Sequence, residues 1–220
     1  MSSGSQGLSR SYEIFEEYWK MYDEWYMRNY AVWVSECLCL KSLGIAGLVL
    51  DVGAGTGVFS KCMRGYVVGV DPALKPLALA AEREVTPVSA FGEYLPFRSE
   101  VFDWAVLVVT ICFLSNPLKV LQEVRRVLKL SGYIATCFIP KESEWGKYYI
   151  MKVWRGGSMF YKYARFYSVR EVLDLLFSAG FSFKEFISTL CRDPHSPPAV
   201  EYPSKNPWGC GFVCVKGVKH

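Results

Sequence analysis

The 220-residue sequence predicts an α/β fold built on a doubly wound, mostly parallel sheet of seven strands. Three observations predict it. The stretch Leu48–Phe59 runs from an apolar strand into three alternating glycines. Strand-like and helix-like segments then alternate up to residue 138. Finally, the chain ends in two strand-like segments joined by the Pro-rich loop Pro194–Pro207, an arrangement that makes the last strand antiparallel.

Length and composition favour one compact domain with appendages. Hydrophobic residues make up 51% of the chain, and the formal net charge of +4 is scattered, so we expect no nucleic-acid partner. No apolar run approaches the ~18–20 residues that span a bilayer. The N-terminus is polar and has no apolar signal-peptide segment. We therefore expect a cytoplasmic protein without a membrane partner.

The N-terminal part, residues 1–44, is predicted to be a helical cap over the ligand-binding edge of the sheet. Residues 1–10 read as a flexible polar leader. A first helix is expected over Ser11–Tyr30, where aromatic and apolar residues recur at spacings of three and four. A second is expected over Val32–Leu43, ended by Gly44.

Residues 45–138 carry the regular alternation and form the predicted core. Asn116 and Pro117 suit the cap and first position of its last helix. The expected strands are Gly47–Val52, Val67–Val70, Thr86–Ser89, Phe102–Val109 and Tyr133–Phe138. The expected helices are Phe59–Arg64, Leu74–Arg83 and Pro117–Leu128.

The alternation stops after residue 138. Residues 139–167 are aromatic and basic, and we expect an inserted lid there. Residues 168–220 are expected to complete the sheet. They supply a helix over Val169–Ala179 and strands over Phe181–Thr189 and Phe212–Val218.

The eight cysteines lie mostly in apolar runs, where a free cysteine acts as a small hydrophobic residue. Cys191 and Cys210 flank a long loop and are candidates for a disulfide across paired strands. The chain has no C-x-x-C pair and only two histidines, so we expect no metal site.

The glycine segment points to a ligand at the carboxyl end of the sheet. Glycine allows a positive φ and a close approach of the backbone to a ligand. A loop between a strand and a following helix presents free backbone N–H groups, and open α/β sheets bind nucleotide-like ligands there. Asp71 ends the next strand, where its carboxylate suits a ribose diol; the alternative role is a helix cap.

Several motifs in order carry a resemblance to a known family. They are Leu50–Gly57, Val70-Asp71, Glu93–Phe97, Phe102-Asp103 and Val127–Gly132, with a weaker echo over Phe166–Phe181. With these motifs the chain resembles class I S-adenosylmethionine-dependent methyltransferases of type 11, the group of the ubiquinone and menaquinone biosynthesis methyltransferases. The resemblance implies a Rossmann-like fold and S-adenosylmethionine as cofactor, with S-adenosylhomocysteine as product. A dehydrogenase is disfavoured, because its G-x-G-x-x-G fingerprint is replaced by Gly53-x-Gly55-x-Gly57.

The resemblance also implies the roles of individual residues. The Gly53 carbonyl would accept the cofactor's ammonium, Asp51 would orient the loop, and Thr110 would face the methionine moiety. The residues expected to bind the cofactor are Asp51, Gly53, Ala54, Gly55, Gly57, Asp71, Pro72, Phe91, Gly92, Glu93 and Thr110.

One segment departs from the family pattern. The family has Gly-Asp-Ala where this chain has Ala90-Phe91-Gly92, so the carboxylate that accepts the adenine amino group is missing. We expect adenine to be recognised instead by the backbone of Gly92 and Glu93, by stacking on Phe91 or Pro72, and by the Glu93 side chain.

The acceptor is expected to be a small molecule, an amine, a thiol or a phenol of the quinone-precursor type. Nucleobase amino methyltransferases carry Asn/Asp-Pro-Pro-Tyr where this chain has Thr110–Leu114, which argues against that class. His195 and Cys112 are weak candidates for a base near the acceptor. The expected pocket residues are Tyr22, Trp25, Tyr26, Tyr30, Tyr149 and Tyr161. The alternatives are a protein methyltransferase and a non-catalytic cofactor-binding scaffold. We expect the protein to be a monomer or a homodimer.

Overall fold

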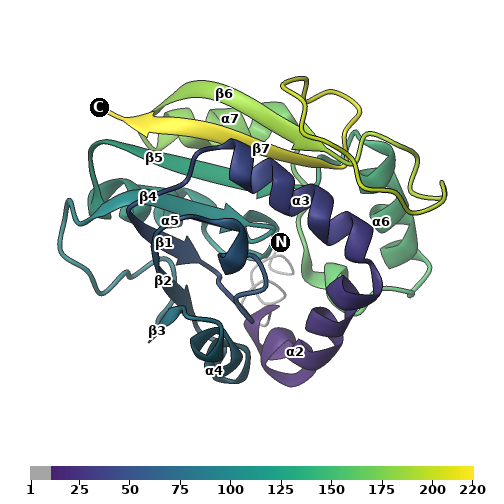
Figure 1. Cartoon of the computed structure of the whole chain (residues 1–220), viewed down its shortest axis with the longest axis horizontal. Helices are drawn as coiled ribbons and strands as arrows, with labels where there is room; N and C mark the ends of the chain where they lie inside the picture. The colour runs from purple at the N-terminus through teal and green to yellow at the C-terminus, as the bar shows by residue number, and fades with distance from the viewer. Residues whose placement is uncertain (1–10) are drawn as a thin grey trace, which may run out of the picture.

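The computed structural model describes residues 11–220; the leader expected at residues 1–10 lies outside the described residues. One seven-stranded sheet has the order β3-β2-β1-β4-β5-β7-β6 (Figure 1). Only β7 runs antiparallel to its neighbours within this sheet, so the predicted fold class and the orientation of the last strand are confirmed. The strands are β1 (Leu48–Val52), β2 (Tyr66–Asp71), β3 (Thr86–Ser89), β4 (Phe102–Val108), β5 (Leu128–Phe138), β6 (Phe181–Thr189) and β7 (Phe212–Lys219).

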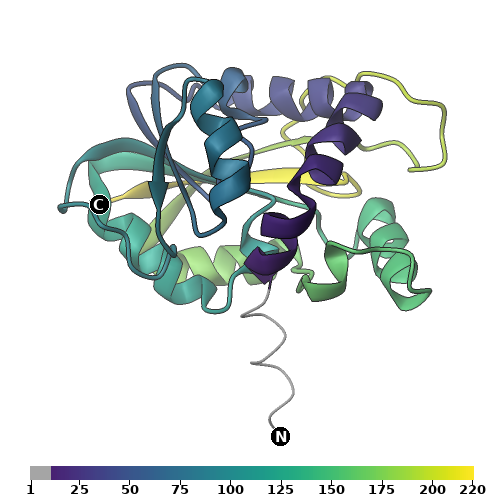
Figure 2. The ribbon, with the colours of Figure 1, turned by 90° about the horizontal axis from the view of Figure 1, so that it is seen from below.

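Helices cover both faces of the sheet, with α3 and α4 on one side and α5 and α7 on the other (Figure 2). Strand side chains alternate between the two cores: Val49 belongs to the α3 side and Leu50 to the α5 side. No helix within residues 11–220 has both the length and the apolar character needed to cross a membrane. The α-helices are α2 (Ser11–Arg28), α3 (Tyr30–Ser42), α4 (Leu74–Glu82), α5 (Pro117–Val127), α6 (Glu144–Trp154) and α7 (Val169–Ser178), and the 3-10 turns are η1 (Ser60–Cys62), η2 (Ile111–Phe113) and η3 (Tyr161–Tyr163).

Three boundaries differ from expectation. The first helix ends at Arg28, and Tyr30 already begins α3. The helix expected behind the glycine loop is the single 3-10 turn η1. Strand β5 begins at Leu128, five residues early, because Leu128 pairs with Phe102 before an irregularity in the ladder. Sheet pairing there outweighs the local helical pattern.

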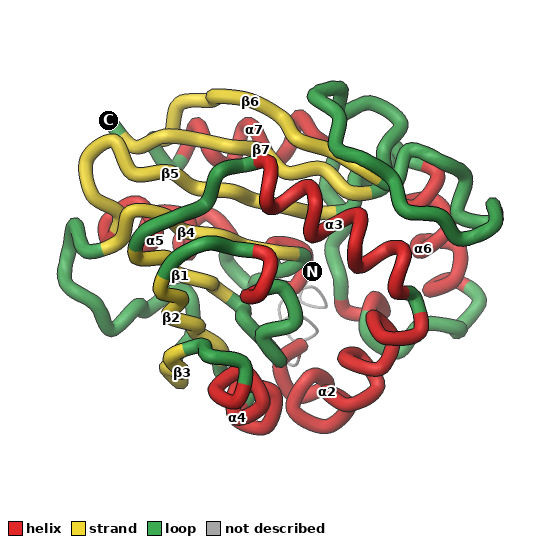
Figure 3. The backbone as a smooth tube through the Cα atoms, viewed as in Figure 1, coloured by secondary structure: helices red, strands yellow, loops and turns green. Residues whose placement is uncertain are grey.

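Helix α2 is the cap: it lines one cavity together with residues that follow β1, β2 and β4, and it lies beside that edge of the sheet (Figure 3). Arg83 holds it to the core: the guanidinium donates to both carboxylate oxygens of Asp23, at 2.6 and 2.8 Å, and to the Thr56 carbonyl at 3.0 Å. Burial opposes the charge of Asp23, but the hydrogen bonds from Arg83 outweigh it, and the pKa of Asp23 lies below its usual value. At the start of α2, the Ser11 hydroxyl donates to the Phe113 carbonyl.

The insert predicted at 139–167 contains α6 and η3. Ser143 caps α6 by accepting from Gly146 N. Trp145 packs against Gly211 and donates its ring N–H to the Arg192 carbonyl, which joins α6 to the long loop between β6 and β7. The insert therefore lies beside α2 at the same edge of the sheet, and its extent as a lid stays a prediction.

Six of the eight cysteines are paired in disulfides: Cys37–Cys62, Cys137–Cys214 and Cys191–Cys210. The third is the pair that the sequence identified as a candidate. The interpretation of cysteines in apolar runs as free small hydrophobic residues applies only to Cys39 and Cys112, which are unpaired and buried. Tertiary pairing explains the difference: Cys137 of β5 and Cys214 of β7 are register partners although 77 residues apart.

The clamp between Arg83 and Asp23 gives a test of how the cap is held. In Arg83→Ala we expect the amides of α2 to exchange with solvent at least about tenfold faster, because hydrogen bonds to charged groups are worth roughly 1.5–3 kcal/mol. Exchange in β1 and β4 should stay unchanged. Hydrogen–deuterium exchange read by mass spectrometry measures both.

The matched control is Arg28→Ala, which removes an exposed ion pair with Glu24 within α2 itself. Exposed ion pairs contribute little to stability, so hydrogen exchange in α2 of this variant should match that of the wild type. Equal exchange in α2 of the Arg83 variant and the wild type would contradict the clamp.

Candidate functional site

The glycine loop after β1 is shaped by the end of β2. The N–H groups of Gly53 and Ala54 both donate to the Val70 carbonyl, at 2.8 and 3.2 Å, and Gly55 N–H donates to a carboxylate oxygen of Asp71 at 2.9 Å. Gly53 and Gly55 have φ of +75° and +51°, in the left-handed region that favours glycine. The loop is therefore fixed by strand β2 without any ligand.

A cavity of about 590 Å³ opens above this loop, and we call it the edge cavity. Its volume falls in the range of small-molecule and cofactor sites. A Cβ on Gly55 would point into open space beside this cavity, so the missing side chain leaves room for a ligand to approach the backbone. Ten of the expected cofactor residues line it together: Asp51, Gly53, Ala54, Gly55, Asp71, Pro72, Phe91, Gly92, Glu93 and Thr110.

Gly57 does not line the edge cavity. A Cβ at this position would lie 3.1 Å from Ala80 of α4 and 3.2 Å from Val85. Its φ is +68°. The third glycine of the motif therefore allows the loop to pack closely on α4.

Two buried carboxyl groups stand at the floor of the edge cavity. Asp51 and Asp71 are 3% and 8% exposed. Burial raises the pKa of Asp51 to about 7, and the charge of Asp71 adds to the shift. Burial also raises the pKa of Asp71 to about 6, although hydrogen bonds from the N–H groups of Ala73 and Gly55 act in the opposite direction. This pair of carboxyls favours a ligand that brings positive charge or hydroxyl donors.

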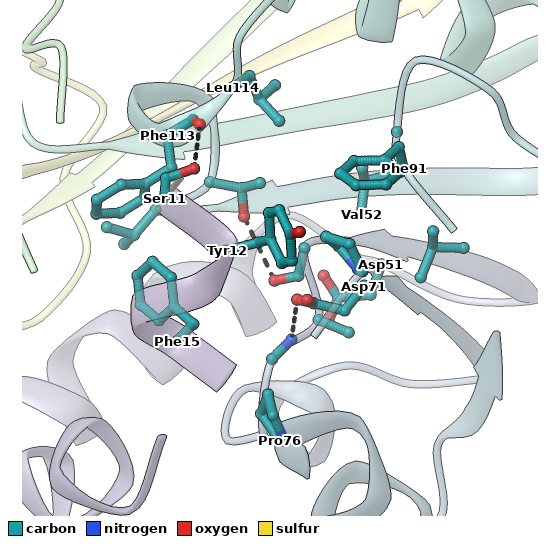
Figure 4. A pocket seen from close by; sticks show the side chains of 18 of the residues that line it. Ser11, Tyr12, Phe15, Asp51, Val52, Asp71, Pro76, Phe91, Phe113 and Leu114 are labelled. Carbon is teal, nitrogen blue, oxygen red and sulfur yellow. Dashed lines mark hydrogen bonds between the residues drawn. The ribbon is translucent and has the colours of Figure 1, made fainter. Parts of the chain in front are cut away.

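Aromatic side chains form the opposite wall (Figure 4). Phe91 is 49% exposed, and its ring meets Tyr12 of α2 edge to face at 5.5 Å. Gly92 lies behind it, with Val52 and Val120 at 3.1 Å from where a Cβ would be. The Glu93 carboxylate accepts the Asn116 N–H at 3.3 Å, which directs it toward α5.

The sequence interpretation missed the part of α2 that faces the edge cavity. The missed residues of α2 are Ser11, Tyr12, Phe15 and Trp19. Their helical spacing was visible in the sequence, but such spacing shows only that one face of the helix is buried. The kink at Tyr18 changes the direction of the helix, and so of this face. Phe113 was also missed, because nothing in the sequence fixes the direction of the turn η2 after β4.

A second space, of about 1000 Å³, lies between α2 and residues 149–163; we call it the aromatic groove. Five of the six expected pocket residues line it: Tyr22, Trp25, Tyr26, Tyr149 and Tyr161. Tyr30 is 58% exposed, contacts Trp33, and lines neither space. Two rings, Tyr22 and Phe113, line both the edge cavity and the aromatic groove, so the two spaces adjoin there.

The two candidate bases lie elsewhere. His195 is exposed in the loop between β6 and β7, where it contacts Tyr148. Cys112 is buried, and burial raises its pKa to about 12, which keeps the thiol protonated and unreactive. Neither residue lines the edge cavity or the aromatic groove.

Comparison with known proteins identifies the fold and the family. Residues 50–136 match the type 11 model of a methyltransferase domain. An uncharacterised protein of Methanocaldococcus jannaschii is 34% identical over 206 residues, which cover 94% of this chain and 98% of that protein. The ubiquinone/menaquinone biosynthesis C-methyltransferase UbiE of Syntrophotalea carbinolica is 34% identical over 102 residues, covering 41% of this chain and 43% of that protein.

A solved structure agrees over nearly the whole chain. The protein is a methyltransferase from Thermotoga maritima, dependent on S-adenosylmethionine and named as a possible histamine N-methyltransferase. It superposes with a TM-score of 0.88 at 31% identity, over 96% of this chain and 100% of that one. The chain therefore belongs to the type 11 family of class I S-adenosylmethionine-dependent methyltransferases and is an enzyme that uses S-adenosylmethionine.

Proposed function

We propose that the enzyme transfers a methyl group to a small-molecule acceptor in the aromatic groove, with the cofactor held in the edge cavity. The observation that carries this proposal is the junction of the two spaces at Tyr22 and Phe113. A donor group and an acceptor held in adjoining spaces can meet only at such a junction. The rings there would align the two and exclude water.

The residues around the edge cavity suit S-adenosylmethionine. The carboxylate of Asp71 would accept the ribose hydroxyls through its remaining lone pairs, and Asp51 would favour the positively charged methionine end. Gly53 and Gly55 would let that end lie close to the loop backbone. Phe91 and Tyr12 present ring surfaces for the adenine, in place of the carboxylate that the family has at position 91.

Bound S-adenosylmethionine would supply an electrophilic methyl carbon on a sulfonium, to be transferred to a lone pair of the acceptor with the C–S bonding electrons left on sulfur. S-adenosylhomocysteine is the product, and the acceptor loses a proton. The protein's part is alignment, with Tyr22 and Phe113 on either side of the transfer path. No described side chain at the junction has a pKa suited to a general base at neutral pH, since burial raises the pKa of Tyr22 above its usual value.

Ring contacts across the aromatic groove support a small acceptor over a protein substrate. Phe160 of the insert stacks on Phe15 at 5.3 Å and meets Tyr22 at 5.6 Å. An extended peptide would have to separate these rings, whereas a small molecule fits beside them. The possible histamine methylation by the Thermotoga maritima relative makes amines one class to include in a substrate screen.

The proposed function is tested by cofactor binding followed by turnover. Isothermal titration should show binding of S-adenosylmethionine and S-adenosylhomocysteine. A screen of amines, thiols, phenols and quinone precursors should then release S-adenosylhomocysteine with at least one class. Turnover of peptides alone would favour a protein methyltransferase, and absence of binding by both cofactor forms would overturn the proposal.

The two carboxyls predict how cofactor binding depends on pH. Their pKa values of about 7 and about 6 are raised in the free protein, and a bound cation would lower them. Binding therefore favours the ionised forms, and affinity should fall as the pH drops from about 7 to about 5, by up to about tenfold per unit for each carboxyl. Titration calorimetry across this range measures it; constant or rising affinity at low pH would contradict the assignment.

Asp71→Asn tests the ribose contact while keeping the side chain's shape. We expect the dissociation constant for S-adenosylhomocysteine to rise about 10- to 100-fold, because each hydrogen bond to a charged group is worth roughly 1.5–3 kcal/mol. The control Asp174→Asn, an exposed position on α7, should bind as the wild type does. Unchanged affinity in the Asp71 variant would remove this residue from the site.

A further inference from the structure

Glu36 is a buried carboxyl that the proposed function has not used. It lies in α3, is 3% exposed, and its Oε2 atom has no hydrogen-bond partner among residues 11–220. A buried polar atom without a partner is costly, and a buried charge requires a counter-charge. The structure therefore points to a missing partner for this side chain.

The space beside Glu36 is a chamber of about 10 Å³, which we call the Glu36 chamber. Its volume is close to the minimum that holds one water-sized group. No lysine, arginine or histidine lines it among the described residues. Five aromatic residues and five apolar or small residues complete its wall: Trp25, Tyr26, Trp145, Tyr149, Tyr161, Val32, Val109, Ile139, Leu190 and Gly211.

The Glu36 chamber lies directly behind the aromatic groove. Trp25, Tyr26, Tyr149 and Tyr161 line both spaces, so the chamber and the aromatic groove adjoin at these four rings. At the other end of the groove, Tyr22 borders the edge cavity, and its hydroxyl lies 3.5 Å from that of Tyr26. One line of contacts thus runs from the cofactor side, along the groove, to the carboxyl.

The electrostatics of the chamber favour a cation. Burial raises the pKa of Glu36 well above its usual value. Its charge in turn adds to the raised pKa values of Tyr26, Tyr149 and Tyr161, whose first cause is burial. Ring faces attract a cation through their quadrupoles, and a carboxylate attracts it directly. A cation of water-sized dimensions satisfies the carboxyl and the rings together.

Resting on the proposed function, we propose that Glu36 and the four shared rings bind the primary ammonium group of the methyl acceptor. An ammonium group is close to a water molecule in size and donates three hydrogen bonds. The atom that receives the methyl group is then a different one, placed near Tyr22 and Phe113 at the cofactor end of the groove. The acceptor class is a primary amine that also carries a second nucleophilic group.

The test measures binding to the enzyme loaded with S-adenosylhomocysteine, so that turnover is not required. The probes are four primary amines, tyramine, histamine, phenethylamine and putrescine, together with tyrosol, the alcohol counterpart of tyramine. At least one amine should bind at least about tenfold more tightly to the wild type than to Glu36→Gln, because charged hydrogen bonds are lost. Tyrosol should bind the two proteins equally.

Two further readouts separate recognition from a structural role. Burial raises the pKa of Glu36, and a bound ammonium would favour the ionised carboxylate, so amine binding should be accompanied by proton release, measured by calorimetry in buffers of different ionisation enthalpy. Glu36→Gln should release none. The control Glu82→Gln, an exposed carboxyl on α4 that lines neither the edge cavity, the aromatic groove nor the Glu36 chamber, should match the wild type in both readouts.

The outcomes distinguish this inference from the proposed function. Failure to load S-adenosylhomocysteine would overturn the function itself. Loading without binding of any of the four amines, or equal amine affinity in wild type and Glu36→Gln, would overturn the assignment of Glu36 alone. The second result would mean that the chamber holds only a structural water.

Discussion

The site depends on the attachment of the glycine loop to the end of β2. Three consecutive N–H groups, from Gly53 to Gly55, donate to the Val70 carbonyl and the Asp71 carboxylate. These bonds set the shape of the loop before a ligand arrives, so cofactor binding need not order it. At the same loop, burial raises the pKa of the Asp51 carboxyl, and the charge of Asp71 adds to that shift. In our proposal a cationic cofactor would lower this pKa, which would link the loop's geometry to its choice of ligand.

The same constraint explains why the cap matters. The edge cavity is open above the loop until α2 crosses it, and α2 is held by the Asp23–Arg83 pair and by Ser11 at Phe113. The Arg83 guanidinium also contacts the Thr56 carbonyl within the glycine loop. One side chain therefore joins the cap, helix α4 and the loop. The helix that covers the edge cavity therefore also forms one wall of the aromatic groove.

Sequence patterns predicted the parts that local chemistry determines. The apolar strands, the three glycines and the carboxylate at the end of β2 were predicted in this way, and the structure places Gly53, Gly55 and Asp71 around the edge cavity. Patterns did not reveal the parts that depend on packing between distant segments. Tyr12 was missed because the orientation of α2 over the sheet is a tertiary property, and the disulfide Cys137–Cys214 depends on the register between β5 and β7. Glu36 was missed for the same reason, since its helix showed only an apolar pattern.

The central claim is that donor and acceptor meet at Tyr22 and Phe113, with the cofactor on the side of Asp51 and Asp71. A crystal structure of the enzyme with S-adenosylhomocysteine tests this most directly. We expect the ribose hydroxyls to lie within hydrogen-bonding distance of Asp71 and the sulfur to face the two rings. A cofactor whose sulfur faces away from the aromatic groove, or whose ribose lies far from Asp71, would contradict it.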